Sequence, residues 1–186
     1  YLCQNFYLKN LFGLINMKIN RIIQIIFSYF RTVYVFESKR NISLLKYKNF
    51  KLKRYNSLKS IKNKFLVSSL KKNKKDNRFK KNQNLIALLY KKKIVCTGWM
   101  HEGNDWLITE INKKINIKGK ILLYDFFTLP NFRNRSFYTK ILNLIKNHKT
   151  KSSFIIYCLK NNNSSKKGIL NSKFKLVDKM KKNVFI

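Results

Sequence analysis

The sequence is poor in acidic residues. Seven Asp or Glu stand against 42 Lys or Arg among 186 residues, which gives a formal net charge of +35. A field this positive attracts anions such as nucleic acid, an anionic membrane or a phosphorylated ligand. Lys, Asn, Ile, Phe and Tyr are also abundant, which is typical of an AT-rich genome. Composition alone is therefore consistent with a polyanionic partner and with codon bias.

Proline, glycine, cysteine and histidine are scarce as well. One Pro and five Gly exclude a collagen-like or low-complexity chain, and 45% hydrophobic residues exclude a disordered tail. Cys3, Cys96 and Cys158 lie far apart, and no pair has the spacing of metal ligands. We therefore expect no metal site and a reducing compartment, either the cytoplasm or an organelle such as the mitochondrion.

Long hydrophobic runs are missing too. No segment has 18 consecutive uncharged apolar residues, so we expect no transmembrane helix. Apolar residues at helical spacing over 19–30 predict an amphipathic helix, which either packs on the domain or lies on a membrane or a partner. Met17 is a candidate start, and the apolar run before it lacks the basic start and cleavage site of a targeting segment. We interpret residues 1–31 as an N-terminal extension and residues 32–186 as one domain.

Residues 39–81 form the most basic region. Leu58, Ile61 and Phe65 predict a helix within it, and the rest reads as basic loop. Aromatic residues interleave with the Lys and Arg; these are Tyr47, Phe50, Tyr55 and Phe79. Such a pattern can hold phosphates and stack on bases, as in RNA binding, or it can be a solvated face with aromatic anchors in the core.

Residues 84–186 carry the clearest alternation of strand and helix patterns. Two apolar runs around Lys91–Lys93 predict a β-hairpin, and the pattern over 121–159 predicts strand, helix and strand with a crossover. The predicted elements are strands over 33–36, 85–90, 94–99, 107–111, 121–128, 154–159 and 174–177, and helices over 137–146 and 165–172. This order predicts an α/β (α+β) fold with a mixed, mostly antiparallel sheet flanked by helices.

A basic turn lies between the strand that ends before Pro130 and the helix that begins near Phe137. It carries Arg133 and Arg135. The free N–H groups of a helix start point beyond the end of the preceding strand, so this layout is typical of an anion site.

From about Leu85 to its end the chain resembles the GNAT N-acetyltransferase superfamily. The acyl-CoA loop of that family follows its fourth strand and usually reads Arg/Gln-x-x-Gly-x-Gly/Ala, which aligns with 133–138 here. Ser136 and Tyr138 replace the two glycines. The later Asn-x-x-Ser pattern is matched by Asn162 and Ser165, and Phe174 follows at the family's spacing with Lys173 in place of glycine.

The resemblance implies acetyl-CoA as the cofactor and an amine as the acceptor. It implies that the backbone N–H groups of 134–138 hold the pyrophosphate, and that the backbone edge over 126–129 pairs with the pantetheine amides. The implied cofactor-binding residues are Phe127, Leu129, Arg133, Asn134, Arg135, Ser136, Phe137, Tyr138, Asn162 and Ser165.

Acyl transfer to an amine needs a base for the amine proton and an acid for the leaving thiolate. The candidate catalytic residues are Glu110, Asp125 and Tyr138. Strand alternation places Asp125 on the face of Leu123, where burial would raise its pKa, as suits a base; the alternative is a structural partner of a lysine. The family's usual acid is a Tyr four residues after the matching Ser. That position is Ile169 here, which leaves Tyr138 or Tyr157 for the role.

The sequence therefore predicts an acyl-CoA-dependent N-acyltransferase. The alternative is an inactive GNAT-like subunit that binds RNA in an organellar ribosome or a similar particle, favoured by the altered loop and the missing acid. A third hypothesis, compatible with the first, is a peripheral membrane enzyme that docks through residues 17–31 and its lysine-rich face.

Overall fold

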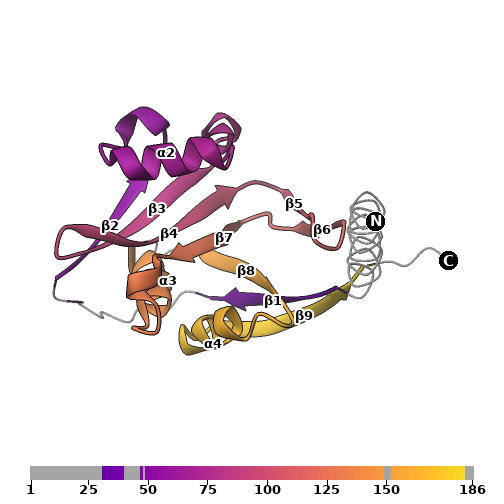
Figure 1. Cartoon of the computed structure of the whole chain (residues 1–186). Coiled ribbons are helices and arrows are strands. Elements are labelled where there is room, and N and C mark those ends of the chain that lie inside the picture. The colour runs from indigo at the N-terminus through magenta and orange to yellow at the C-terminus, as the bar shows by residue number, and fades with distance from the viewer. Residues whose placement is uncertain (1–30, 40–46, 48, 149–151, 183–186) are drawn as a thin grey trace, which may run out of the picture.

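The computed structural model describes residues 31–39, 47, 49–148 and 152–182 (Figure 1). The predicted helix over 19–30 and the candidate start lie outside these residues. The strands are β1 Thr32–Ser38, β2 Phe50–Tyr55, β3 Asn84–Tyr90, β4 Lys93–Glu102, β5 Asp105–Ile108, β6 Lys113–Asn116, β7 Lys120–Thr128, β8 Ser153–Leu159 and β9 Lys175–Lys181. The α-helices are α2 Lys64–Lys72, α3 Phe137–His148 and α4 Asn163–Asn171, and the 3-10 turns are η1 Leu58–Ser60, η2 Asp76–Lys81 and η3 Pro130–Phe132.

Seven of these strands form one sheet in the order β2-β3-β4-β7-β8-β1-β9, and β5 pairs with β6 in a separate hairpin. All neighbours in the large sheet are antiparallel except β7 and β8. Parallel neighbours need a crossover connection, and α3 supplies it. The predicted fold class, a mixed and mostly antiparallel sheet flanked by helices, is confirmed.

The first described strand occupies an inner position of the sheet. Val33 in β1 lies opposite Leu159 of β8 on one side and Met180 of β9 on the other. Because β1 is antiparallel to both, β8 and β9 run in the same direction, and α4 connects them past β1. The strand itself was predicted, but its neighbours were not.

Each face of the sheet carries its own core. On one face α3 and α4 pack through Phe137, Ile141 and Ile169 onto buried strand residues such as Phe154. On the other face α2, η1 and the β5–β6 hairpin cover a second cluster that centres on Trp99. In α3 the buried residues follow the helical repeat, which explains why its amphipathic pattern was readable.

Two strands were missed in the sequence. β2 lies in the region expected to be helix and loop, where Phe50 and Leu52 are half-buried while Lys51 and Lys53 are exposed. β6 alternates in the same way. The lysines on the outward face lower the mean hydropathy of both segments, so the period of two was hidden. β5 ends at Ile108, so the strand expected over 107–111 begins and ends earlier than predicted.

In the part of the chain that the structure describes, we find no helix with the length and apolar character needed to cross a bilayer.

Candidate functional site

The site is built where β7 and β8 diverge. Their pairing runs from Lys120 opposite Ser153 to Leu123 opposite Ile156, and both strands continue beyond it. A β-bulge lies at this point, because Trp99 of β4 faces Tyr124 whereas Thr97 faces Phe127. The bulge bends β7, and its edge over 124–128 is left without pairing to β8.

The basic turn after β7 has two residues in the left-handed region. Asn134 has φ 59° and Ser136 has φ 57°. This conformation is one that glycine adopts without strain and serine adopts rarely. Arg133 is fixed beside β7, because its Nε donates to the carbonyl oxygen of Thr128 at 3.3 Å and its guanidinium lies 5.6 Å from the centre of the Phe127 ring.

Helix α3 begins directly after this turn. Its first intrahelical bond runs from the N–H of Lys140 to the carbonyl of Ser136, at 3.0 Å. The N–H groups of residues 137–139 precede that bond, so they are free to bind an anion and lie at the positive end of the helix dipole.

A cleft of about 490 Å³, here called the loop cleft, lies between this turn, the end of β7 and α4. Two cations, Arg133 and Lys167, line it, and there is no carboxylate among its described lining residues. The other lining residues are Phe126, Phe127, Thr128, Phe132, Asn134, Ser136, Phe137, Tyr138, Thr139, Ser164, Ser165, Gly168 and Asn171. Its charge and its free N–H groups suit a phosphorylated ligand.

A second cleft, here called the far cleft, measures about 750 Å³ and lies toward the core cluster of Trp99. Glu110, Asp125 and Tyr157 line it, together with cations from η2 and the turn before it. Phe126, Tyr138 and Ser165 line both clefts. These three residues therefore form the wall between the two clefts.

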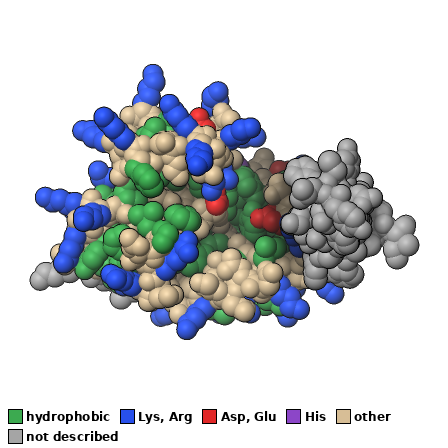
Figure 2. Space-filling model, in the orientation of Figure 1, with side chains coloured by type: hydrophobic (Ala, Val, Ile, Leu, Met, Phe, Trp, Pro, Cys, Tyr) green, Lys and Arg blue, Asp and Glu red, His purple; other side chains and the backbone are tan. Residues whose placement is uncertain are grey.

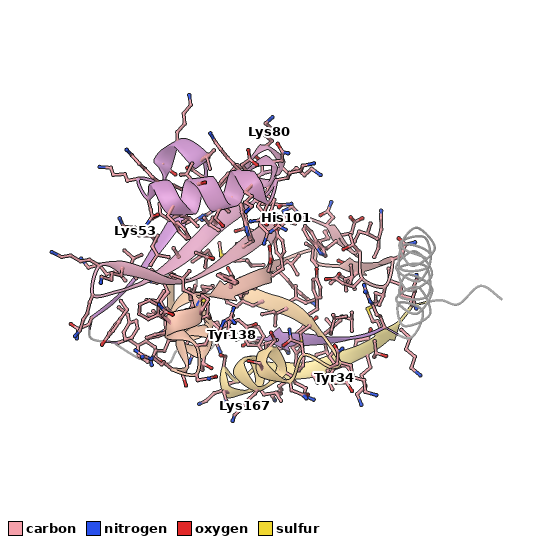
Figure 3. The ribbon with its side chains drawn as sticks, viewed as in Figure 1. Tyr34, Lys53, Lys80, His101, Tyr138 and Lys167 are labelled. Atoms are coloured by element: carbon pink, nitrogen blue, oxygen red, sulfur yellow. The ribbon has the colours of Figure 1, made fainter. Side chains whose placement is uncertain are left out.

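Tyr138 is the largest residue of this wall; it is the second residue of α3, and its side chain contacts α4 at Gly168 (Figure 3). Its ring centre is 5.3 Å from that of Phe126. Two glycines make room for the pair: a Cβ on Gly168 would lie 2.5 Å from Tyr138, and one on Gly98 would lie 2.3 Å from Phe126. Burial, with smaller contributions from Cys158 and Cys96, raises the pKa of Tyr138 far above its usual value, so its hydroxyl stays protonated at neutral pH.

Asp125 is not the buried, neutral carboxyl that strand alternation predicted. Its Oδ2 lies 2.7 Å from Nζ of Lys75 and 2.5 Å from a guanidinium nitrogen of Arg78. Burial alone would raise the pKa of Asp125, but hydrogen bonds and charges from these two cations outweigh it and lower the pKa. The bulge explains the error: with φ 48° at Asp125, the side chain leaves the face of Leu123 and joins the far cleft. The ion pair with Lys75 is the arrangement that the alternative, a structural partner of a lysine, predicted.

Glu110 lies in the turn between β5 and β6, where Thr109 Oγ1 donates to its Oε2 at 3.3 Å. It faces the far cleft together with Tyr157. Burial raises the pKa of Tyr157 to about 12, against a hydrogen bond donated by Trp106, and the negative charge of Glu110 adds to the rise. Glu110 is thus the carboxylate of this cleft for which no ion pair with Lys or Arg is seen among the described residues.

Seven of the ten predicted cofactor residues line the loop cleft: Phe127, Arg133, Asn134, Ser136, Phe137, Tyr138 and Ser165. Three do not. Leu129 follows the last residue of β7, and its N–H donates to the carbonyl of Val95 in β4 at 3.0 Å, so this N–H points away from the free edge. Asn162 caps α4 by accepting the N–H of Ser165 at 3.0 Å and lines the far cleft, and Arg135 is exposed on the turn.

Sequence reasoning missed the contribution of α4 to the loop cleft. Ser164, Gly168 and Asn171 line it and recur at helical spacing. The spacing i, i+4, i+7 was the available signal, since such residues share one face of a helix. Among the described residues, no group of His, Cys, Asp and Glu is arranged to hold a metal ion.

No protein-family model matches the chain, and no curated protein matches it in sequence. Solved structures match it in fold. A conserved protein of unknown function from Staphylococcus epidermidis superposes with a TM-score of 0.55 at 8% identity, over 83% of this chain and 62% of that one. A candidate acetyltransferase of the GNAT family from Novosphingobium aromaticivorans superposes with a TM-score of 0.52 at 7% identity, over 81% of this chain and 61% of that one.

This chain has a GNAT-like fold. The likeness concerns the fold alone, and the chain spans about three fifths of the length of each of these two structures. The strand, basic turn and helix that border the loop cleft also contain the loop motif on which the sequence resemblance rests.

Proposed function

We propose that this protein is an acyl-CoA-dependent N-acyltransferase that transfers an acetyl group from acetyl-CoA to an amine. One observation carries the proposal: in a GNAT-like fold, the free start of α3 and the unpaired edge of β7 border the same cleft. A pyrophosphate needs the first of these features and an extended amide chain needs the second.

The residues of the loop cleft fit acetyl-CoA. The N–H groups of 137–139 and the left-handed turn at Ser136 would hold the pyrophosphate, and Arg133 and Lys167 would neutralise it. The edge over 124–128 would hold the amides of the pantetheine arm. When bound, the cofactor supplies an activated acyl thioester.

Glu110 is assigned the role of general base. Asp125 is already paired with Lys75 and Arg78, which holds it as a carboxylate of low basicity. Tyr138 is assigned the role of acid, because it carries a hydroxyl and lies in the wall between the clefts. Its hydroxyl would protonate the leaving thiolate after Glu110 has taken the proton of the amine.

Calorimetric titration of acetyl-CoA at about 0.3 M salt tests the cofactor site, because this salt screens loose attraction to the +35 charge. We expect micromolar binding to the wild type and none to Ser136→Trp, whose indole would fill the turn. Ser69→Trp is the matched control, since Ser69 is exposed on α2 away from both clefts. Absence of binding to the wild type would refute the proposal and favour the RNA-binding subunit. RNA affinity would then fall steeply with salt.

Glu110→Gln tests the assignment of the base. We expect kcat to fall by about 100-fold or more while the affinity for acetyl-CoA is unchanged, because general bases contribute about 10²- to 10⁴-fold. Steady-state kinetics with a panel of amines measures the first quantity and calorimetry the second. An unchanged kcat would remove Glu110 from the mechanism.

A further inference from the structure

The far cleft has an excess of positive charge that the proposed chemistry does not use. Four cationic side chains line it, against the two carboxylates of Glu110 and Asp125. The four are Lys74, Lys75, Arg78 and Lys81. All come from one short segment, the turn after α2 and the 3-10 turn η2. Figure 2 shows Lys and Arg side chains over the α2 end of the molecule as well as along the other edges of this face.

Two of these cations are held in place. Oδ2 of Asp125 accepts from both Lys75 and Arg78, so one negative charge is shared by two positive charges. The guanidinium of Arg78 also lies over two rings, 5.1 Å from the centre of Trp99 and 5.2 Å from that of Tyr124. Fixed cations lose little side-chain entropy when they bind a ligand.

The fixed arginine keeps unused donors. A guanidinium has five N–H groups, and Asp125 takes one of those of Arg78. Lys74 and Lys81 reach the same cleft from exposed positions. Arg and Lys together in a concave site are suited to a compact oxyanion, because Arg can contact two of its oxygens and Lys supplies a point charge.

We propose that the far cleft binds an anionic group, a phosphate or a carboxylate, that is carried by the acceptor amine. The anion lies against Arg78, Lys74 and Lys81, and the amine extends toward Glu110 and the wall at Tyr138. The role as acceptor site rests on the proposed acyltransfer. The anion site itself does not, and its binding is measurable without any cofactor.

Three small amines that share one backbone provide the test. Ethanolamine is neutral at its far end, β-alanine ends in a carboxylate and O-phosphoethanolamine ends in a phosphate. Each is titrated into the full chain by calorimetry at about 0.3 M salt, which screens non-specific attraction of anions to the overall positive charge of the protein. We expect at least one of the two anionic amines to bind ten-fold or more tightly than ethanolamine, and which one it is distinguishes phosphate from carboxylate.

Matched variants locate the binding. Lys74→Gln with Lys81→Gln should lower the affinity for the anionic amine about ten-fold. Lys71→Gln with Lys72→Gln makes the same change of charge on α2 outside the far cleft, and should change it less than two-fold. Arg78→Lys keeps the charge but loses the planar fork, so it should also weaken binding.

Equal affinity for the three amines would overturn the proposal. So would equal losses in the two double variants, since these would mean that only the overall charge attracts the anion. Titration of acetyl-CoA separates the two proposals: discrimination among the amines without binding of acetyl-CoA would leave the anion site and remove acyltransfer. Binding of acetyl-CoA without discrimination among the three amines would remove the anion site and leave the proposed acyltransfer standing.

Discussion

Gly168 allows a sharp test of where the ring of Tyr138 lies. It is in the middle of α4, and a Cβ there would be 2.5 Å from Cδ1 and 3.0 Å from Cε1 of Tyr138. The ring cannot swing away freely, because it packs against Phe126. The helix cannot shift freely either, because it is hydrogen-bonded to α3: Thr139 Oγ1 donates to the carbonyl of Gly168 at 3.5 Å, and Ser172 Oγ donates to the carbonyl of Thr139 at 3.4 Å.

Two effects of opposite sign compete in Gly168→Ala. Alanine is favoured over glycine in a helix interior by about 0.8–1.0 kcal/mol. Overpacking a filled core costs about 1–3 kcal/mol, and a contact of 2.5 Å against a held ring belongs in the upper half of that range. We therefore expect Gly168→Ala to lower the free energy of unfolding by about 1–2 kcal/mol, as measured by urea denaturation.

A double-mutant cycle with Tyr138→Ala makes this test decisive. Without the ring only the helix preference is left, so Gly168→Ala should raise the free energy of unfolding by about 0.5–1 kcal/mol in that background. Lys167→Ala on the exposed side of the same helix is the control and should change it by less than about 0.5 kcal/mol. If Gly168→Ala has the same sign and size in both backgrounds, the ring of Tyr138 does not occupy the wall between the clefts.

Three further predictions follow from the site. Ser136→Gly should raise the free energy of unfolding by about 0.5–1 kcal/mol in urea titrations, because φ is 57° there, and binding of acetyl-CoA should persist. Asp125→Asn should cost about 1 kcal/mol at pH 7. Since ion pairing lowers the pKa of Asp125 in the folded state, this stabilisation is fully present above the unfolded pKa of about 4 and is lost as pH falls through the lower folded-state pKa, so the difference between the thermal melts of wild type and variant should shrink as the pH is lowered below about 4. Tyr138→Phe should lower kcat at least ten-fold with stability changed by less than about 1 kcal/mol. An unchanged kcat would leave Tyr138 as a packing residue alone.

The elements around the loop cleft could be predicted because their patterns are local. β7 and β8 are nearly continuous apolar runs, and α3 repeats its buried residues at helical spacing. The hairpin of β3 and β4 was readable although its turn lacks Asn-Gly. Lys91 and Lys92 adopt φ values of 47° and 65° there, which shows that strand pairing on both sides outweighs the cost of left-handed lysines.

The ion pairing and the ionisation of Asp125 could not be predicted, because they depend on contacts with residues that are distant in sequence. Arg78 lies 47 positions earlier in the chain, on a 3-10 turn that packs against the sheet only in the folded protein. The bulge beside Gly98 also shifts the strand alternation by one residue, and it arises from the fit of two strands rather than from either sequence alone. The inner position of β1 has the same origin, since its partners come from the other end of the chain.

The wall between the clefts connects the altered loop motif to function. In the proposed reaction, an acyl group in the loop cleft and an amine in the far cleft would meet at the wall of Phe126, Tyr138 and Ser165, which line both clefts. In the sequence resemblance Tyr138 aligns with the second glycine or alanine of the GNAT loop, and this residue lies in the wall between the clefts. The family's usual tyrosine acid is replaced by Ile169, which is fully buried and has no polar group to offer. Under the proposed function Tyr138, rather than position 169, supplies the acid, and the kcat of Tyr138→Phe tests this assignment.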